Sequence, residues 1–185
     1  MKLLVIILAI LNSFLANLEQ KTLQSDFTVT VAEDVTAPMN YPGTLTMHGK
    51  LFRLSMFNIE AAYDGQTLYM YSPEIDELTL SNPTEQELLE ANPFLYAQAL
   101  VPVCHVVERT SGDQTIVTLT PKDQSIGINR FVLKVRTGDL MPLSIEIKEG
   151  QKTTTLKMKT PAFVESKPTY TIQADKDTYI NDMRL

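Results

Sequence analysis

Cysteine and histidine are scarce in this sequence of 185 residues. A single Cys excludes an internal disulfide and a cysteine-rich zinc site, and with only two His residues we expect no histidine-based metal centre. The chain has no cluster of Lys and Arg and a formal net charge of −6, so it lacks the basic footprint of a nucleic-acid-binding protein. We therefore expect no metal, no cofactor and no nucleic-acid partner.

Catalytic signatures are missing as well. The sequence has no G-x-S-x-G, no Gly-rich phosphate loop and no H-E-x-x-H. Cys104 and His105 are adjacent, but neighbours in a strand point to opposite faces, so this thiol and imidazole would not meet. The carboxylates of Glu74, Asp76 and Glu77 gather at a predicted hairpin and are expected to be solvated turn residues. We expect no catalytic residue and no enzyme, and an enzyme that uses Cys104 is the alternative.

Long hydrophobic runs are confined to the N-terminus. Residues 3–11 are apolar, which is the length of the hydrophobic region of a secretory signal and too short for a membrane span. We expect residues 1–16 to be a signal peptide and residues 17–185 to form one domain. Phe14 stands where a small residue is usual before a cut after Ala16. The alternative is therefore a retained hydrophobic helix, buried under a sheet.

Apolar side chains at every second position dominate the rest of the chain. A period of two marks strands with one dry face and one solvated face. The alternation recurs in "SDFTVTV", "GTLTM", "LFRLSM", "IVTLT", "FVLKV", "LSIEIK" and "TLKMK". Turn signals separate the runs at short intervals, among them "PG" at 42–43, "DG" at 64–65 and "TGD" at 137–139. We expect about ten or eleven antiparallel strands in a meander and, without βαβ alternation, no parallel sheet.

One region breaks this pattern. Residues 81–100, "SNPTEQELLEANPFLYAQAL", are predicted to form two short helices that each begin at Asn-Pro. Asn82 would cap the first helix, with Glu85 at the spacing of a capping box, and Asn92 would cap the second. The apolar faces of these helices need an apolar surface, and the dry face of the sheet offers one. The candidate lid residues are Leu88, Leu89, Phe94 and Leu95.

A curved sheet with so few helices leaves part of its dry face uncovered, which predicts a hydrophobic cavity. The alternative is an ordinary core filled by the protein's own side chains. Met suits a cavity wall because its side chain is flexible and polarisable. The candidate cavity residues are Leu45, Met47, Leu54, Met56, Leu68, Met70, Val117, Leu119, Leu133, Val135, Ile145, Ile147, Leu156 and Met158.

In order and spacing these segments resemble the LolA family, the periplasmic carriers of outer-membrane lipoproteins in bacteria. The most specific pieces are the "DG-x-x-L-Y-x-Y-x-P" hairpin at 64–73 and "L-T-P-K" at 119–122. The resemblance implies a mainly β fold with a few α-helices, an unclosed antiparallel half-barrel covered by short lid helices, whose cavity takes acyl chains. It also implies a periplasmic protein, expected to be a monomer, with acylated lipoproteins, an inner-membrane exporter and an outer-membrane acceptor as partners.

The sequence departs from the family at one turn. Typical members carry an Arg-Pro pair there, and that Arg latches the lid. Here the turn reads "MHGKLFR", and Lys50 and Arg53 are the nearby candidates to replace the missing Arg. Because related proteins of this fold bind other lipids or act as sensors of envelope stress, a lipid-binding sensor or regulator of the cell envelope is the alternative function.

Overall fold

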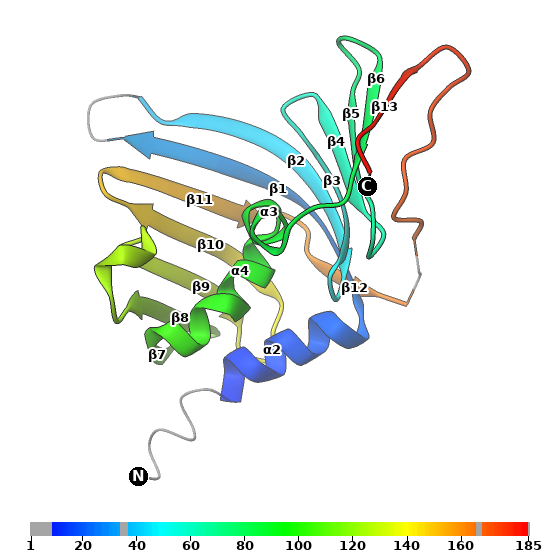
Figure 1. Ribbon diagram of the computed structural model, residues 1–185. Helices are drawn as coiled ribbons and strands as arrows, with labels where there is room; N and C mark the ends of the chain where they lie inside the picture. Colours follow the sequence, from blue (N-terminus) through cyan, green and yellow to red (C-terminus); the bar gives the residue numbers. More distant parts are fainter. Residues whose placement is uncertain (1–8, 34–36, 166–167, 185) are drawn as a thin grey trace.

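The computed structural model describes residues 9–33, 37–165 and 168–184 (Figure 1). Its helices are α2 (Ala9–Gln20), α3 (Glu85–Ala91) and α4 (Pro93–Leu100), with short 3-10 turns at Val101–Val103 and Gln124–Ile126. The strands are β1 (Thr22–Glu33), β2 (Met39–His48), β3 (Leu51–Met56), β4 (Ile59–Tyr63), β5 (Leu68–Ser72), β6 (Glu77–Ser81), β7 (Cys104–Ser111), β8 (Gln114–Pro121), β9 (Arg130–Arg136), β10 (Pro142–Glu149), β11 (Lys152–Met158), β12 (Ala162–Val164) and β13 (Tyr179–Asp182).

The strands form one open, curved sheet. Its order is β13-β6-β5-β4-β3-β2-β1-β11-β10-β9-β8-β7, and the short β12 pairs with β1 outside this path. The predicted mainly β, unclosed architecture is confirmed. The described residues form thirteen strands rather than ten or eleven, and β13 pairs with β6 in parallel, so the expectation of a purely antiparallel sheet is wrong at this edge.

The period-two alternation places the core on one face of the sheet. Strand β9 has the burial pattern that alternation predicts, with Phe131, Leu133 and Val135 fully buried and the residues between them more exposed. Phe27 of β1 and Met47 of β2 are buried in the same core. In Figure 1, α3 and α4 lie across the hollow of the curved sheet, and α2 crosses one end. The helices therefore cover only part of the apolar face.

Helix α2 belongs to the folded core. Leu11, Phe14 and Leu18 are buried at helical spacing and join the same core as the sheet, and the rings of Phe14 and Phe94 lie 5.7 Å apart. A cut after Ala16 would fall inside this helix. The predicted signal peptide lies partly outside the described residues, and its removal stays a prediction.

Helices α3 and α4 begin at different kinds of cap. Asn92 caps α4 as expected, with its Oδ1 accepting from the N–H groups of Phe94 and Leu95, and Pro93 is the first helical residue. Helix α3 is instead capped by Thr84, whose hydroxyl accepts from Glu87 N–H while the Glu87 carboxylate accepts from Thr84 N–H. The capping box predicted at Asn82 thus lies two residues further along the chain, where both reciprocal hydrogen bonds form.

The expectation of a turn at Pro42–Gly43 is also wrong, because both residues lie inside β2. Gly43 is paired with Phe27 of β1 and Met56 of β3. A Cβ at this position would lie 2.6 Å from the carbonyl oxygen of Ser55 and closer still to the Phe27 ring. This glycine marks close packing within a strand rather than a turn.

The C-terminal segment covers the outer face of the sheet's far end. Ile172 packs with Ala62, Leu78 and Leu80 in a small cluster separate from the main core. The chain then returns along β6, and the backbone N–H of Met183 donates to the Leu80 carbonyl oxygen at 2.8 Å. Within the described ranges, none of the helices has the length and hydropathy needed to cross a membrane.

Candidate functional site

An apolar cavity of about 200 Å³ lies between the sheet and the junction of α3 and α4. Strands on both sides of β1 contribute apolar side chains, and Ala91, Asn92 and Pro93 close it from the helical side. Glu90, Asn92 and Thr154 are its polar members. The lining residues are Phe27, Val29, Leu45, Phe52, Leu54, Met56, Glu90, Ala91, Asn92, Pro93, Ile145, Ile147, Thr154 and Leu156. A concave space with mostly apolar walls and few polar groups suits a hydrocarbon ligand.

The predicted cavity residues fall into two groups. Six of them line this cavity, namely Leu45, Leu54, Met56, Ile145, Ile147 and Leu156. Most of the others are closed in the core, namely Met47, Val117, Leu119, Leu133, Val135 and Met158. Leu68 packs against that core, and Met70 is 42% exposed although its register with Ala61 puts it on the cavity face. Acyl-chain binding by these residues stays a prediction.

Sequence reasoning missed several lining residues. Phe27, Val29 and Phe52 belong to the alternating apolar runs, so the signal for them was present. Thr154 lies two residues before Leu156 and opposite Ile147, so strand alternation places it on the cavity face although it is polar. The placement of Asn92 depends on how α4 packs on the sheet, which is a tertiary feature.

The two lid helices differ in how firmly they are held. Helix α4 buries Phe94, Leu95, Ala97 and Leu100. Helix α3 has no buried residue, and Leu88 and Leu89 are only partly covered. Because local stability follows buried apolar contact, α3 is the part of the cover that opens at least cost, whereas α4 is anchored in the core.

A wider cavity of about 840 Å³ continues from the apolar one along α3. The two share Glu90, Pro93 and Ile147, and the carboxylates of Glu85 and Glu149 also line the wider one. Burial raises the pKa of the Tyr96 hydroxyl in this wall, and the negative charges of Glu149 and Glu90 raise it further. The rim between the wider cavity and the apolar one therefore carries negative charge.

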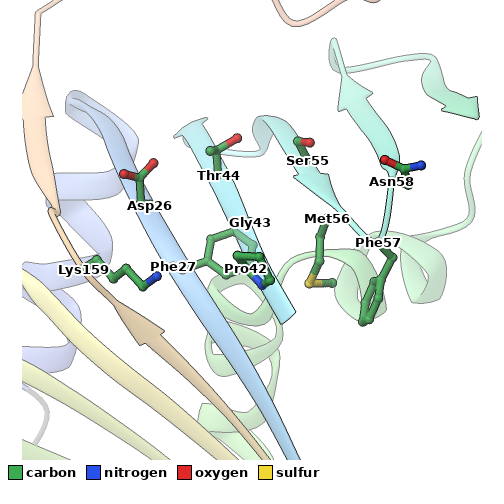
Figure 2. Close-up of a pocket in the computed structure, with 10 residues that line it drawn as sticks. All are labelled: Asp26, Phe27, Pro42, Gly43, Thr44, Ser55, Met56, Phe57, Asn58 and Lys159. Carbon is green, nitrogen blue, oxygen red and sulfur yellow. The ribbon is translucent and has the colours of Figure 1, made fainter. Parts of the chain in front are cut away.

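The opposite border of the apolar cavity reaches the surface at the β3–β4 turn. Figure 2 shows Phe27, Met56 and Phe57 on one side of the sheet, and Asp26, Thr44 and Ser55 pointing to the other. A cavity of about 410 Å³ at this turn shares Phe27 and Met56 with the apolar one. Phe57 is 52% exposed, at a φ of 55° that a bulky residue seldom adopts. An exposed aromatic in a strained turn extends the apolar wall outward.

Of the two cations near the missing Arg-Pro turn, Lys50 is the one on the lid side. It lines a small pocket with Glu85 and Leu88 of α3. Arg53 lies on the outer face, where its guanidinium is 2.8 Å from the Glu60 carboxylate. Arg53 therefore does not face the lid.

The groups weighed as catalytic candidates do not come together. The Cys104 thiol is buried, and burial raises its pKa, which disfavours the nucleophilic thiolate. His105 is exposed on the opposite side of β7. Asp76 instead fixes the C-terminal segment by accepting from the Thr178 hydroxyl at 3.0 Å. Among the described residues, no group of three or more His, Cys, Asp or Glu side chains is placed to hold a metal ion.

Comparison with known proteins gives one sequence relative. The chain is 28% identical over 152 residues to an outer-membrane lipoprotein carrier protein of Photobacterium profundum, a match that spans 78% of this chain and 70% of the relative. The chain is LolA-like. No family model matches the sequence.

Solved structures agree on the fold of this LolA-like chain. An uncharacterised conserved protein from Thermus thermophilus superposes with a TM-score of 0.62 at 11% identity, covering 93% of this chain and 96% of that one. MucB of Pseudomonas aeruginosa, in its complex with MucA, superposes with a TM-score of 0.51 at 14% identity, covering 86% of this chain and 57% of that one. At these identities the likeness is one of fold.

Proposed function

We propose that this protein is a periplasmic carrier that binds the acyl chains of lipoproteins in its apolar cavity and moves them from the inner to the outer membrane. The observation that carries the proposal is the apolar cavity under the loosely packed α3. The relative named as an outer-membrane lipoprotein carrier supports the cargo class. An exporter in the inner membrane and an acceptor at the outer membrane are the partners that such a route requires.

The small size of the cavity suggests how such a carrier releases its cargo. At about 200 Å³ it is smaller than the roughly 300 Å³ at which ligand pockets usually begin, so α3 must move for acyl chains to enter. Each buried methylene of an acyl chain contributes about 0.8 kcal/mol. The return of α3 to the emptied cavity offsets part of that gain, because lid and cargo compete for the same surface.

The test is release of a lipoprotein from membranes. The purified protein is incubated with spheroplasts that export a tri-acylated lipoprotein, and the supernatant is examined by native mass spectrometry. A stoichiometric, water-soluble complex of protein and lipoprotein is the expected result. Binding of free fatty acid or phospholipid without lipoprotein release would refute the carrier function.

Two variants of one strand sharpen this test. Leu54 lines the cavity, and Ser55 points to the other side of the sheet. Leu54→Asn should abolish lipoprotein release, because it places an unpaired amide in an apolar cavity. Ser55→Asn should leave release intact. Equal activity of the two variants would place the binding surface elsewhere.

A lipid-binding regulator is the competing function on this scaffold. MucB, which shares the fold, has been solved bound to the protein MucA, so the fold also accommodates a protein partner. The spheroplast experiment separates the two, because a regulator binds lipid or peptide without extracting a lipoprotein.

A further inference from the structure

The side chain of Asn92 has an unusual place in the apolar cavity. Asn92 is only 2% exposed, and it lines the cavity at the junction of α3 and α4. Its Oδ1 is used twice, by the N–H groups of Phe94 at 3.0 Å and Leu95 at 3.4 Å. Its Nδ2 has no hydrogen-bond partner among the described residues and is shielded from the cavity space in this structure, so a ligand atom can reach it only when the α3–α4 junction moves.

Capping alone does not require this amide group. Asp, Ser and Thr cap helices about as well as Asn, and only Asn adds an NH₂ group. A buried donor without an acceptor costs about 1–3 kcal/mol, so the Asn92 amide is a liability in the empty cavity. Because Oδ1 is fixed by two backbone donors, the orientation that leaves Nδ2 as the free group is also fixed.

The free group selects one class of ligand atom. An amide NH₂ donates hydrogen bonds, so its partner must be an acceptor that enters together with an apolar chain. The rim carboxylates of Glu90 and Glu149 disfavour a second anion beside the apolar cavity, whereas Glu85 shares a pocket with Lys50. A neutral carbonyl oxygen, such as that of an ester-linked or amide-linked acyl group, meets both conditions, whereas the carboxylate of a free fatty acid meets only the first.

We infer that Asn92 is the polar anchor of the cavity, and that its Nδ2 donates to the carbonyl oxygen of an ester- or amide-linked acyl chain. This inference rests on the proposed function, since it concerns how the same cavity recognises its cargo. The apolar wall alone cannot distinguish an acyl chain from another hydrocarbon chain, because chains of equal length bury equal area whatever their head group. The hydrogen bond from Asn92 would supply that selectivity.

The test compares two lipids that differ in a single carbonyl. Monopalmitoylglycerol carries an ester, and hexadecylglycerol is its ether analogue with a matched chain and head group. Their affinities are measured by displacement of the neutral fluorescent probe N-phenylnaphthylamine from the wild-type protein. A hydrogen bond in an enclosed apolar site predicts about a tenfold preference for the ester. Equal affinities of the wild type for both lipids would overturn the inference.

Two substitutions at Asn92 isolate the donor from the cap. Asn92→Asp keeps an oxygen that caps α4 and replaces the NH₂ group with an acceptor, and Asn92→Ser keeps a capping hydroxyl without adding charge. Both should bind the ether as the wild type does and lose the preference for the ester. A preference that survives in Asn92→Ser would overturn the inference. Because the readout is a ratio between two ligands, general loosening of the fold does not imitate it.

Palmitate tests the charged rim with the same displacement measurement. We expect the wild type to bind palmitate at least tenfold more weakly than monopalmitoylglycerol at low ionic strength, because the carboxylate meets Glu90 and Glu149. The double substitution Glu90→Gln with Glu149→Gln should narrow that gap. If the wild type binds palmitate and monopalmitoylglycerol equally well, or if the double variant keeps the full difference in affinity, the rim carboxylates do not select against anions. The inferred restriction to neutral acyl groups would then be wrong.

The spheroplast experiment keeps the two proposals distinguishable. Lipoprotein release together with equal binding of ester and ether refutes the role of Asn92 and leaves the carrier function standing. Ester preference without lipoprotein release refutes the carrier function and leaves Asn92 as the anchor of a lipid-binding site. Failure of both lipids to displace the probe refutes the role of Asn92, and lipoprotein release alone then decides the carrier function.

Discussion

Gly43 allows β1, β2 and β3 to pack closely because it has no side chain. A Cβ at this position would press on the Ser55 carbonyl oxygen and on the ring of Phe27, so Gly43→Ala should lower the free energy of unfolding by about 1–3 kcal/mol. Urea denaturation measures this change. Gly138→Ala is the matched control, because nothing lies within 4 Å of its added Cβ. Similar losses of unfolding free energy in the two variants would show that Phe27 and β3 shift to accommodate the added Cβ at little energetic cost.

The half-buried carboxylate of Glu108 binds the first turn of helix α2 to the edge of the sheet. Glu108 of β7 accepts a hydrogen bond from Leu11 N–H at 3.1 Å, and its burial raises its pKa although the N–H groups of Leu11 and Ile10 lower it. A raised folded-state pKa favours folding below the unfolded value of about 4.5, and that contribution is lost as the pH rises through the folded value.

Replacing that carboxyl tests the sign of this effect. Glu108→Gln keeps an oxygen for Leu11 N–H and removes the half-buried charge, so its stability relative to wild type should rise between pH 4 and pH 7. Urea midpoints across that range measure the difference. Glu74→Gln, at an exposed turn position, controls for the loss of one negative charge. If the stability of Glu108→Gln relative to wild type falls as the pH rises, the pKa of Glu108 is lowered on folding rather than raised.

Single residues also show how far the sequence could be read. Alternation places Leu54 and Leu133 on the same kind of dry face, yet Leu54 lines the cavity and Leu133 is sealed in the core. A period of two gives the face of a side chain, but its depth under the helices depends on the curvature of the sheet. The fold was therefore predictable in outline, the cavity only in part, and Asn92 only as a cap.

Among the helices, α3 is the least buried, and we expect its cap to control how often it opens. The Thr84 hydroxyl and the Glu87 carboxylate satisfy each other's backbone N–H groups. Thr84→Ala should lose about 1 kcal/mol of local stability and raise the hydrogen-exchange rate of residues 85–91 roughly fivefold. The global unfolding midpoint should barely change, because α3 has no buried residue.

The same variant should take up lipid faster if α3 is the gate. Stopped-flow mixing with N-phenylnaphthylamine measures the rate, and Thr84→Ser, which retains a capping hydroxyl, is the control. Faster exchange without faster uptake would separate the opening of α3 from ligand entry. In that event the entrance would lie elsewhere, and the β3–β4 turn with its exposed Phe57 would be the next place to examine.

Each helix of the lid was predictable because its signals are local. Asn-Pro before an apolar run indicated the place of both helices, although only Pro93 of α4 is a first helical residue and Pro83 precedes the Thr84 cap of α3. The choice between Asn82 and Thr84 as the cap of α3 was not predictable, because Asn82–Glu85 and Thr84–Glu87 have the same capping-box spacing. The structure uses the pair that forms both reciprocal hydrogen bonds.

At the scale of the whole molecule, the strand pairing at the edge of the sheet could not be predicted from the sequence. Strand β13 pairs with β6 about a hundred residues earlier in the chain, and no short-range pattern encodes such a pairing. Its pairing also blunts an edge, because an unpaired β6 would present free N–H and C=O groups to other molecules. The parallel strand and the cluster around Ile172 thus act together as a cover for one end of the half-barrel.

Removing that cover should promote association of the chain with further copies of itself. A chain that ends at Glu165 loses Ile172 from the cluster with Ala62, Leu78 and Leu80, and it frees the edge of β6. We expect dimers or larger species in size-exclusion chromatography with light scattering, since an apolar patch beside an open edge favours pairing with a second copy.

Two point substitutions in the full chain separate the patch from the edge. Ile172→Ser disturbs the buried cluster and leaves β13 in place, whereas Ile180→Ser changes a residue of β13 that is already 51% exposed. If the open edge drives association, Ile172→Ser should be less stable by about 2–4 kcal/mol but should not associate, and Ile180→Ser should match the wild type. Association of Ile172→Ser to the same extent as the shortened chain would assign the effect to the apolar patch. A shortened chain that stays monomeric would show that β6 needs no cover, and the C-terminal segment would then serve the stability of the fold alone.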